Sequence, residues 1–251
     1  MVRVILPWLK NRYLKVRNQH KVLPTGARIN LTARDSLNIF QKARCARYVV
    51  FDIETTGFDA TRDRIVGIGA VRIQNGRIRT GESFNQIVNP KIQMSAESVK
   101  VHRIMPQTAL SAPPASKVID AFLEYVGRDI LVAHCAGFDV GFLNRYMKQR
   151  YGFGLQNMVL DAMPLSRIFL LPDSEQNPTC RIKMLGEGRG GRAQHRCTLD
   201  EMARYLGIVI HKRHTGIGDS LATGLIFQRI LAKAEKRHMD RLIHLISLGG
   251  L

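Results

Sequence analysis

A buried strand that ends in two acids is the feature that most constrains this chain. Residues 48–51 read YVVF, a β-branched and aromatic run typical of a strand inside a hydrophobic core. The strand continues through Asp52 and Glu54 into the rest of FDIETTG. Because side chains alternate along a strand, positions 52 and 54 share one face and their carboxylates stand side by side. Two such charges repel each other and are costly to desolvate. Either the strand end is open to water, or these acids hold a metal ion.

The chain after this strand alternates between strand and helix patterns. Asn75-Gly76 is a strong hairpin signal, so the second and third strands are predicted to be antiparallel. Two short apolar strands follow, each leading into a helical pattern, and this order favours an α/β domain with a mixed sheet. Further strands are predicted over residues 64–73, 76–88, 129–134 and 159–161, and helices over 95–101, 115–126, 138–149, up to 170, 198–207, 218–233 and 235–248.

Two later segments also place acids where the apolar pattern predicts burial or a sheet edge. In AHCAGFDVGFL, residues 133–143, Asp139 follows a strand and opens a helix. In RHTGIGDSLATGLIF, residues 213–227, His214 precedes Asp219 by five positions. Taken singly, Asp139 is explained as a first-turn acid and Asp219 as a helix cap. The conjunction of all these groups instead indicates one site.

Carboxylates without cysteine suit hard, oxygen-seeking ions such as magnesium or manganese. Two such ions can activate a water and stabilise the leaving oxygen of a phosphodiester, and a histidine can take the proton of that water. The four cysteines are scattered with no CxxC pair, which argues against a disulfide framework and favours a reducing, cytoplasmic setting. Cys180, His195 and Cys197 match no familiar zinc-site spacing.

The charge balance points to a polyanionic partner. The sequence of 251 residues holds 38 Lys and Arg against 20 Asp and Glu, a net charge of +18, and strongly basic chains commonly bind nucleic acid. Residues 1–44 form a basic extension, predicted to be helical around residues 35–44 and to pack on the domain or touch nucleic acid. Peripheral membrane contact through Trp8 remains an alternative. No run approaches the apolar length of a membrane helix, so no integral membrane association is expected.

Together FDIETTGFD, VHRI at residues 101–104, AHCAGFDVGFL and the H-x4-D pair resemble the motifs of the DEDDh, or DnaQ-like, 3′–5′ exonucleases. The resemblance runs from about residue 47 to residue 232. It implies a ribonuclease H-like mixed sheet with three antiparallel strands first, and two Mg²⁺ or Mn²⁺ ions in each active site. The implied metal ligands are Asp52, Glu54, Asp139 and Asp219, with His214 as general base.

The resemblance also implies a substrate side to the cleft. Asp161 and Thr198 are expected to be structural. Cys135 stands where many relatives carry an amide, and Arg103 stands where a small residue is common, so contacts with substrate are expected to differ there. The residues expected to approach the 3′-terminal nucleotide are Thr55, Thr56, Gly57, His102, His134 and Phe138.

The predicted organisation is a basic extension over 1–44, an exonuclease domain over 45–235 and a C-terminal helix over 236–251. The predicted activity is metal-dependent release of nucleoside 5′-monophosphates from nucleic-acid 3′ ends. FDIETTG looks more like the proofreading branch, which favours single-stranded or frayed DNA. An RNA 3′-end exoribonuclease, or a catalytically silent nucleic-acid-binding module associated with a polymerase, are the alternatives. A polymerase or repair partner stays open, although few residues follow Asp219 to form a tethering tail.

Overall fold

Five strands form one mixed sheet at the centre of the molecule. The computed structural model describes residues 14, 18, 22–35, 37–171 and 197–251. The strand order is β3-β2-β1-β4-β5, with β1–β2 and β2–β3 antiparallel and β1–β4 and β4–β5 parallel. The predicted ribonuclease H-like sheet is thereby confirmed. The strands are β1 Arg47–Thr55, β2 Ile65–Gln74, β3 Arg77–Ile87, β4 Ile130–Ala133 and β5 Val159–Asp161.

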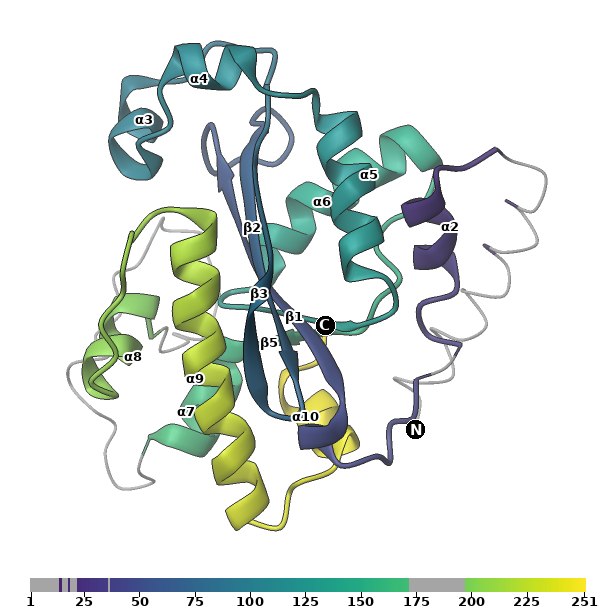
Figure 1. The fold of residues 1–251 in the computed structure, drawn as a ribbon, viewed down its shortest axis with the longest axis vertical. Coiled ribbons are helices and arrows are strands. Elements are labelled where there is room, and N and C mark those ends of the chain that lie inside the picture. The colour runs from purple at the N-terminus through teal and green to yellow at the C-terminus, as the bar shows by residue number, and fades with distance from the viewer. Residues whose placement is uncertain (1–13, 15–17, 19–21, 36, 172–196) are drawn as a thin grey trace, which may run out of the picture.

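Helices cover both faces of the sheet (Figure 1). On one face lie α2 Thr25–Leu31, α5 Ala115–Val126 and α6 Gly137–Tyr151. On the other lie α7 Ala162–Leu170, α8 Leu199–Tyr205, α9 Gly216–Lys236 and α10 Leu242–Gly249. Two short helices, α3 Ala96–His102 and α4 Pro106–Ser111, lie beyond one end of the sheet (Figure 1). None of the helices in the described part of the chain combines the length and apolar character that a membrane span needs.

The apolar alternation of β1 builds two separate cores. Tyr48 and Val50 pack with the helices α7 to α10, whereas Val49 and Phe51 pack with α2, α5 and α6. All four side chains are fully buried, so β1 is the central strand that both layers share. The run of buried residues ends at Asp52, which is only partly buried. The strand therefore carries its two acids out of the core at its carboxyl end.

The segment that leads into β1 pairs with the segment that leads into α10. The backbone N–H of Ala43 donates to the carbonyl of Asp240 at 2.6 Å, and the N–H of Leu242 donates to the carbonyl of Gln41 at 3.0 Å. The N–H of Ile243 donates to the carbonyl of Ile39 at 2.8 Å. These bonds join residues about two hundred positions apart in sequence, so they close the fold on the α10 side of the sheet.

Two predicted helices differ from the structure. The helix expected around residues 35–44 is wrong: α2 occupies Thr25–Leu31, and the described residues of the later stretch hold only a single 3-10 turn, Ala43–Cys45. Gly26 explains the position of α2, because a Cβ there would stand 2.6 Å from the carbonyl oxygen of Asp120 on α5. The expected C-terminal helix over 235–248 is interrupted. α9 runs to Lys236, His238 takes a left-handed conformation with φ of 55°, and α10 starts at Leu242.

Two further differences from the sequence predictions concern α4 and Cys197. The sequence pattern missed α4, which begins with Pro106, a residue suited to the first helical turn. The predicted basic loop over residues 172–197 lies outside the described residues except for Cys197. Cys197 is buried and disulfide-bonded, which departs from the expectation of reduced cysteines.

Candidate active site

Three carboxylates converge where β1 ends and α9 begins. One oxygen each from Asp52, Glu54 and Asp219 lies within 4.8 Å of the other two. Asp52 and Glu54 share a face of β1 as the alternation predicts, and their partners across the ladder on β2 are Gly69 and Gly67. Asp219 sits in the first turn of α9 and is 3% exposed. The structure thus brings together three of the four predicted metal ligands.

A close backbone approach delivers α9 to this point. Gly69 of β2 packs directly on Gly216 at the start of α9, and a Cβ on either residue would collide with the backbone of the other element. The hydroxyl of Ser220 strengthens the contact by donating to the carbonyl of Gly69 at 2.8 Å. Glycine is required here because only a strand and a helix without side chains at the contact can approach so closely. The glycines therefore fix the position of Asp219 relative to β1.

Asp139 lies beside the cluster but is used differently. It stands in the first turn of α6, is 3% exposed, and its Oδ1 accepts a hydrogen bond from the backbone N–H of Ile53 at 2.9 Å. Ile53 lies between the two acids of β1, so this bond ties α6 to the strand at the cluster. The negative charge of Asp139 also raises the pKa of Asp52. Asp139 is thus a neighbour of the three-carboxylate cluster and not a member of it.

His214 lies on the turn that leads into α9. Its φ of 60° is left-handed, and its proximity opposes the rise that burial causes in the pKa of Asp219. Thr215 caps α9 by accepting the N–H of Gly218 at 3.2 Å, and its own hydroxyl donates to the carbonyl of Lys212 at 2.7 Å. The half-buried imidazole is therefore held next to Asp219 by a tightly bonded turn.

Arg213 is a site residue that the sequence pattern missed. Its Nε and Nη2 donate to the two carboxylate oxygens of Asp200 at 2.7 and 3.0 Å, and its Nη1 donates to Asp219. Asp200 stands in the first turn of α8, which begins with a capping box between Thr198 and Glu201. A fork of this kind favours arginine over lysine. The signal was present as an arginine directly before the predicted base, but nothing in one sequence marked Asp200 as its partner.

Burial and mutual repulsion disfavour the charged forms of the acids. Burial, followed by the charge of Asp219, raises the pKa of Glu54 to about 7, and burial raises the pKa of Asp139 to about 8. Burial and the surrounding carboxylates raise the pKa of Asp52 well above its ordinary value. Arg213 opposes these increases at Asp52 and Glu54. The single positive charge of Arg213 does not neutralise the negative charge of all these carboxylates. The site therefore favours binding of a cation.

The donor set fits a hard divalent cation. Every side-chain atom in the cluster that can serve as a ligand is a carboxylate oxygen, and such oxygens are the ligands of magnesium and manganese. Within the described residues, Oδ1 of Asp219 is buried and has no hydrogen-bond partner. A buried carboxylate oxygen without a donor is costly, and a bound cation removes that cost. The residues present therefore match the ion type that the sequence predicted.

The threonines of FDIETTG direct their hydroxyls into their own loop. The hydroxyl of Thr55 donates to the carbonyl of Gly57 at 2.6 Å. The hydroxyl of Thr56 donates to Oδ1 of Asp63 at 2.9 Å, and accepts the N–H of Arg64 at 3.0 Å. A Cβ at Gly57 would strike the Asp63 carboxylate. These groups shape the β1–β2 connection, residues 56–64.

The other predicted substrate residues fall in two places. His102 ends α3 and is 2% exposed; its Nδ1 accepts the N–H of Ile104 at 3.0 Å, and its Nε2 is buried without a partner in the described chain. Nε2 of His134 lies 2.8 Å from the carbonyl of Cys197, so this ring turns toward the start of α8. Phe138 is half-buried beside Phe142 on α6, with ring centroids 5.0 Å apart. Of these three side chains, His102 and His134 are held within the fold, and Phe138 lies half-buried on α6.

Cys135 and Arg103, the two residues that depart from the family motifs, both have left-handed backbone conformations. Cys135 has φ of 61°, donates its N–H to Asp161 at 3.0 Å and points its sulfur at that of Met163, 3.6 Å away. Arg103 is exposed and closes α3 in a left-handed conformation with φ of 58°. Asp161 caps α7 and Thr198 caps α8, as expected for structural residues.

Comparison with known proteins decides the family. The exonuclease family model RNase_T matches residues 49–227, which span all the carboxylates described above. The chain belongs to this exonuclease family. The family predicted from the ordered motifs is thereby confirmed.

Curated relatives of this exonuclease chain are much longer than it is. It is 35% identical over 193 residues to a PolC-type DNA polymerase III of Clostridium perfringens, covering 77% of the chain and 12% of the relative. It is 37% identical over 193 residues to a DNA polymerase III subunit epsilon-like protein of Rhodobacter capsulatus, covering 76% of the chain and 24% of the relative. The chain thus spans about a quarter or less of the length of these relatives.

A solved structure shares the fold. The zinc-bound complex of Escherichia coli exonuclease I with single-stranded DNA superposes with a TM-score of 0.60 at 15% identity, covering 76% of the chain and 41% of that protein. At this identity the likeness is one of fold. It agrees with the mixed sheet and its flanking helices.

Proposed function

We propose that this chain is a divalent-metal-dependent 3′–5′ exonuclease that releases nucleoside 5′-monophosphates from nucleic-acid 3′ ends, with DNA favoured. The observation that carries the proposal is the three-carboxylate cluster with a buried, unpartnered oxygen on Asp219, beside His214. Membership of the exonuclease family supports hydrolysis of a phosphodiester. The curated relatives are named as DNA polymerase III proteins, and the solved neighbour holds single-stranded DNA, which supports DNA as substrate.

Asp52, Glu54 and Asp219 would hold the ions, with Asp139 completing the second site through water, and the cofactor would be two Mg²⁺ or Mn²⁺. Bound ions of this kind polarise a phosphodiester and lower the pKa of an attacking water. The imidazole of His214 would accept the proton of that water while the water oxygen bonds to phosphorus and the P–O3′ bond breaks. The leaving 3′-oxygen would take up a proton from solvent. The capped turn at Thr215 holds the His214 backbone beside Asp219.

Arg213 stabilises the site before the ions bind. Its guanidinium is fixed on Asp200 and touches Asp219, so it supplies positive charge to a cluster that otherwise repels itself. It also joins α8 to the His214 turn. The remaining substrate contacts are assigned to the backbone of Thr55, Thr56 and Gly57, and to the side chains of His102, His134 and Phe138. We further propose a cytoplasmic enzyme with residues 45–235 as its exonuclease domain and a polymerase or repair protein as partner.

The test is digestion of single-stranded DNA and RNA of one sequence, each labelled at the 5′ end. With Mg²⁺ or Mn²⁺ the labelled DNA should shorten stepwise, and excess EDTA should stop the reaction. Asp52→Asn and Asp219→Asn should abolish shortening, whereas Glu124→Gln, an exposed carboxylate on α5, should not change it. Faster loss of RNA than of DNA would assign the alternative substrate. Binding without hydrolysis would support the silent module, and hydrolysis in EDTA would exclude the metal mechanism.

A further inference from the structure

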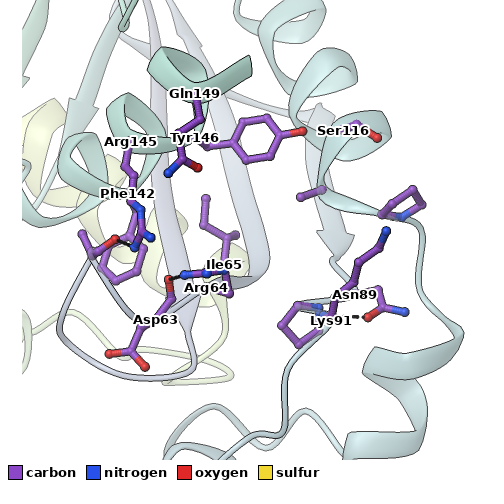
Figure 2. Close-up of a pocket in the computed structure, with 14 residues that line it drawn as sticks. Asp63, Arg64, Ile65, Asn89, Lys91, Ser116, Phe142, Arg145, Tyr146 and Gln149 are labelled. Atoms are coloured by element: carbon purple, nitrogen blue, oxygen red, sulfur yellow. Dashed lines mark hydrogen bonds between the residues drawn. The ribbon is translucent and has the colours of Figure 1, made fainter. Parts of the chain in front are cut away.

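A cavity of about 360 Å³ lies beside the β1–β2 connection (Figure 2). Its walls come from that connection, from the turn at residues 89–91, from the start of α5 and from the outer half of α6. In Figure 2 the residues of the connection lie across the open space from Asn89 and Lys91. The proposed metal ligands are not among its lining residues. The volume falls in the range of small-molecule sites and is large enough for one nucleotide.

The walls combine positive charge with aromatic surface. Arg64, Lys91 and Arg145 line the cavity, and within the described chain none of them forms an ion pair with a carboxylate. Phe142 and Tyr146 stand one turn apart on α6 and form an apolar wall. Cations beside aromatic rings suit a ligand that carries both a negative charge and a flat ring.

Acidic groups do not cancel this charge. Asp63 is the carboxylate among the described lining residues, and both its oxygens are used: Oδ1 accepts from Thr56 and Oδ2 accepts the N–H of Asp59, each at 2.9 Å. Figure 2 shows its carboxylate on the side away from Lys91. Arg145 donates to the carbonyl of Ala60, which holds the connection against α6 and keeps the cationic wall in place.

The cavity and the proposed active site share two structural elements. The β1–β2 connection belongs to both, because Thr56 follows the acids of β1 and bonds to Asp63 in the cavity wall. On α6, the rings of Phe138 and Phe142 are in contact, and Phe138 is a proposed substrate residue whereas Phe142 lines the cavity. A strand whose 3′ end lies at the carboxylates and passes Phe138 is therefore directed toward this cavity.

We propose that the cavity binds an upstream nucleotide of the substrate strand. Its base packs against the wall formed by Tyr146 and Phe142, and its phosphate is bound by Lys91 and Arg64. The inference rests on the proposed exonuclease function, and it makes strand length a determinant of affinity. A strand too short to reach the cavity binds through its 3′ end alone. A longer strand gains one stacked base and one phosphate contact.

The test is equilibrium binding of 5′-fluorescein-labelled dithymidylate and octathymidylate to the full chain in EDTA, measured by fluorescence anisotropy. Lys91→Gln removes one of the exposed cations that line the cavity. The matched control is Lys117→Gln, an exposed lysine on α5 that does not line the cavity. For octathymidylate, Lys91→Gln should weaken binding about tenfold and lower the slope of log affinity against log salt by about 0.7, the value for one lost single-strand phosphate contact. For dithymidylate it should change neither quantity, and Lys117→Gln should match the native chain.

A second variant probes stacking. Tyr146→Leu keeps an apolar side chain but removes the ring, and should weaken octathymidylate about tenfold while sparing dithymidylate. Equal effects of Lys91→Gln and Lys117→Gln on the binding of both strands would overturn the proposal. It would also be overturned if free thymidine 5′-monophosphate competed with the labelled strand and Lys91→Gln abolished that competition, because the cavity would then bind a separate nucleotide. These binding outcomes are distinct from failure of the exonuclease proposal, which would appear as absence of hydrolysis with metal despite length-dependent binding.

Discussion

At the scale of single residues, His214 combines a proposed chemical role with an unusual backbone. Its left-handed φ of 60° means that a substitution must tolerate this conformation, as asparagine does. His214→Asn should therefore keep the fold and the Asp219 contact, yet lower kcat by about a hundredfold or more because the proton acceptor is gone. Single-turnover digestion, with the thermal unfolding midpoint and strand affinity as controls, measures this. A rate near that of the native chain would show that another group takes the proton.

Arg213 leads to a prediction about stability with and without metal. Arg213→Met keeps the length of the side chain and removes its charge, so Asp219 and Asp200 lose their shared cation. Without metal, the free energy of unfolding should fall by about 2 kcal/mol, since the buried carboxylate of Asp219 is left without its cation. Saturating Mg²⁺ should recover part of the loss because the ions neutralise Asp219. Urea unfolding in EDTA and in Mg²⁺ tests this; an equal loss in both would contradict the role.

The site residues that the sequence predicted depend on local patterns, whereas the residue that it missed depends on a contact distant in sequence. Asp52 and Glu54 follow from strand alternation, and His214 and Asp219 from a local spacing. Arg213 lies on the turn before α9 and acts through Asp200, thirteen positions away on α8. Such a pairing is set by how α8 packs next to α9, which local patterns do not encode. The hydrogen bond from the Thr56 hydroxyl to Asp63 could not be predicted for the same reason, because Asp63 lies at the far end of the β1–β2 connection.

At the scale of elements, the contact between β2 and α9 controls the site. Gly69→Ala places a Cβ against the backbone of Gly216, and backbone cannot move aside as a flexible side chain can. We expect the free energy of unfolding to fall by about 3 kcal/mol. We also expect the folded variant to digest DNA more slowly than the native chain, because Asp219 and His214 move with α9. Gly81→Ala on β3 is the control, since its Cβ would meet nothing within 4 Å. Urea unfolding and DNA digestion of both variants test it, and native-like activity in Gly69→Ala would refute it.

Elements with strong periodic or turn signals were predictable, whereas those fixed by packing were not. The β2–β3 hairpin follows from Asn75 and Gly76, both with positive φ, and β5 lies at the predicted residues. α2 is a short helix that depends on Gly26 fitting against α5, and no local pattern announces that contact. The break between α9 and α10 arises at His238, a residue with no intrinsic breaking tendency. Long-range pairing of residues 240–243 with residues 39–43 explains why the chain turns there.

At the scale of the whole molecule, the acidic cluster makes stability depend on pH. The folded pKa of Glu54 is raised to about 7 and that of Asp139 to about 8, above their unfolded values. Groups raised in this way contribute stability that is fully present below the unfolded pKa and is lost as pH rises through the folded pKa. In EDTA, unfolding free energy should therefore fall between about pH 5 and about pH 8.5, by about 3 kcal/mol from Glu54 alone.

Two comparisons isolate the cause of this pH dependence. Glu54→Gln should flatten the decline, because the group that loses its proton is absent. Mg²⁺ should also oppose it, since ions bind the deprotonated acids and their affinity rises over the same pH range. Urea unfolding at several pH values measures all three conditions. A stability that does not change with pH in EDTA would show that the cluster stays charged without strain.

The pairing of residues 39–43 with residues 240–243 has a consequence for how the chain is made. The strand that carries Asp52 and Glu54 leaves the ribosome early, but the segment that leads into it finds its backbone partners only when residue 243 has emerged. Contacts so distant in sequence form late, because a long loop must close before they gain anything. Until residue 243 has emerged, the α10 side of the sheet therefore lacks its last cover. A nascent chain of this enzyme should need protection there, and should not yet hold a finished active site.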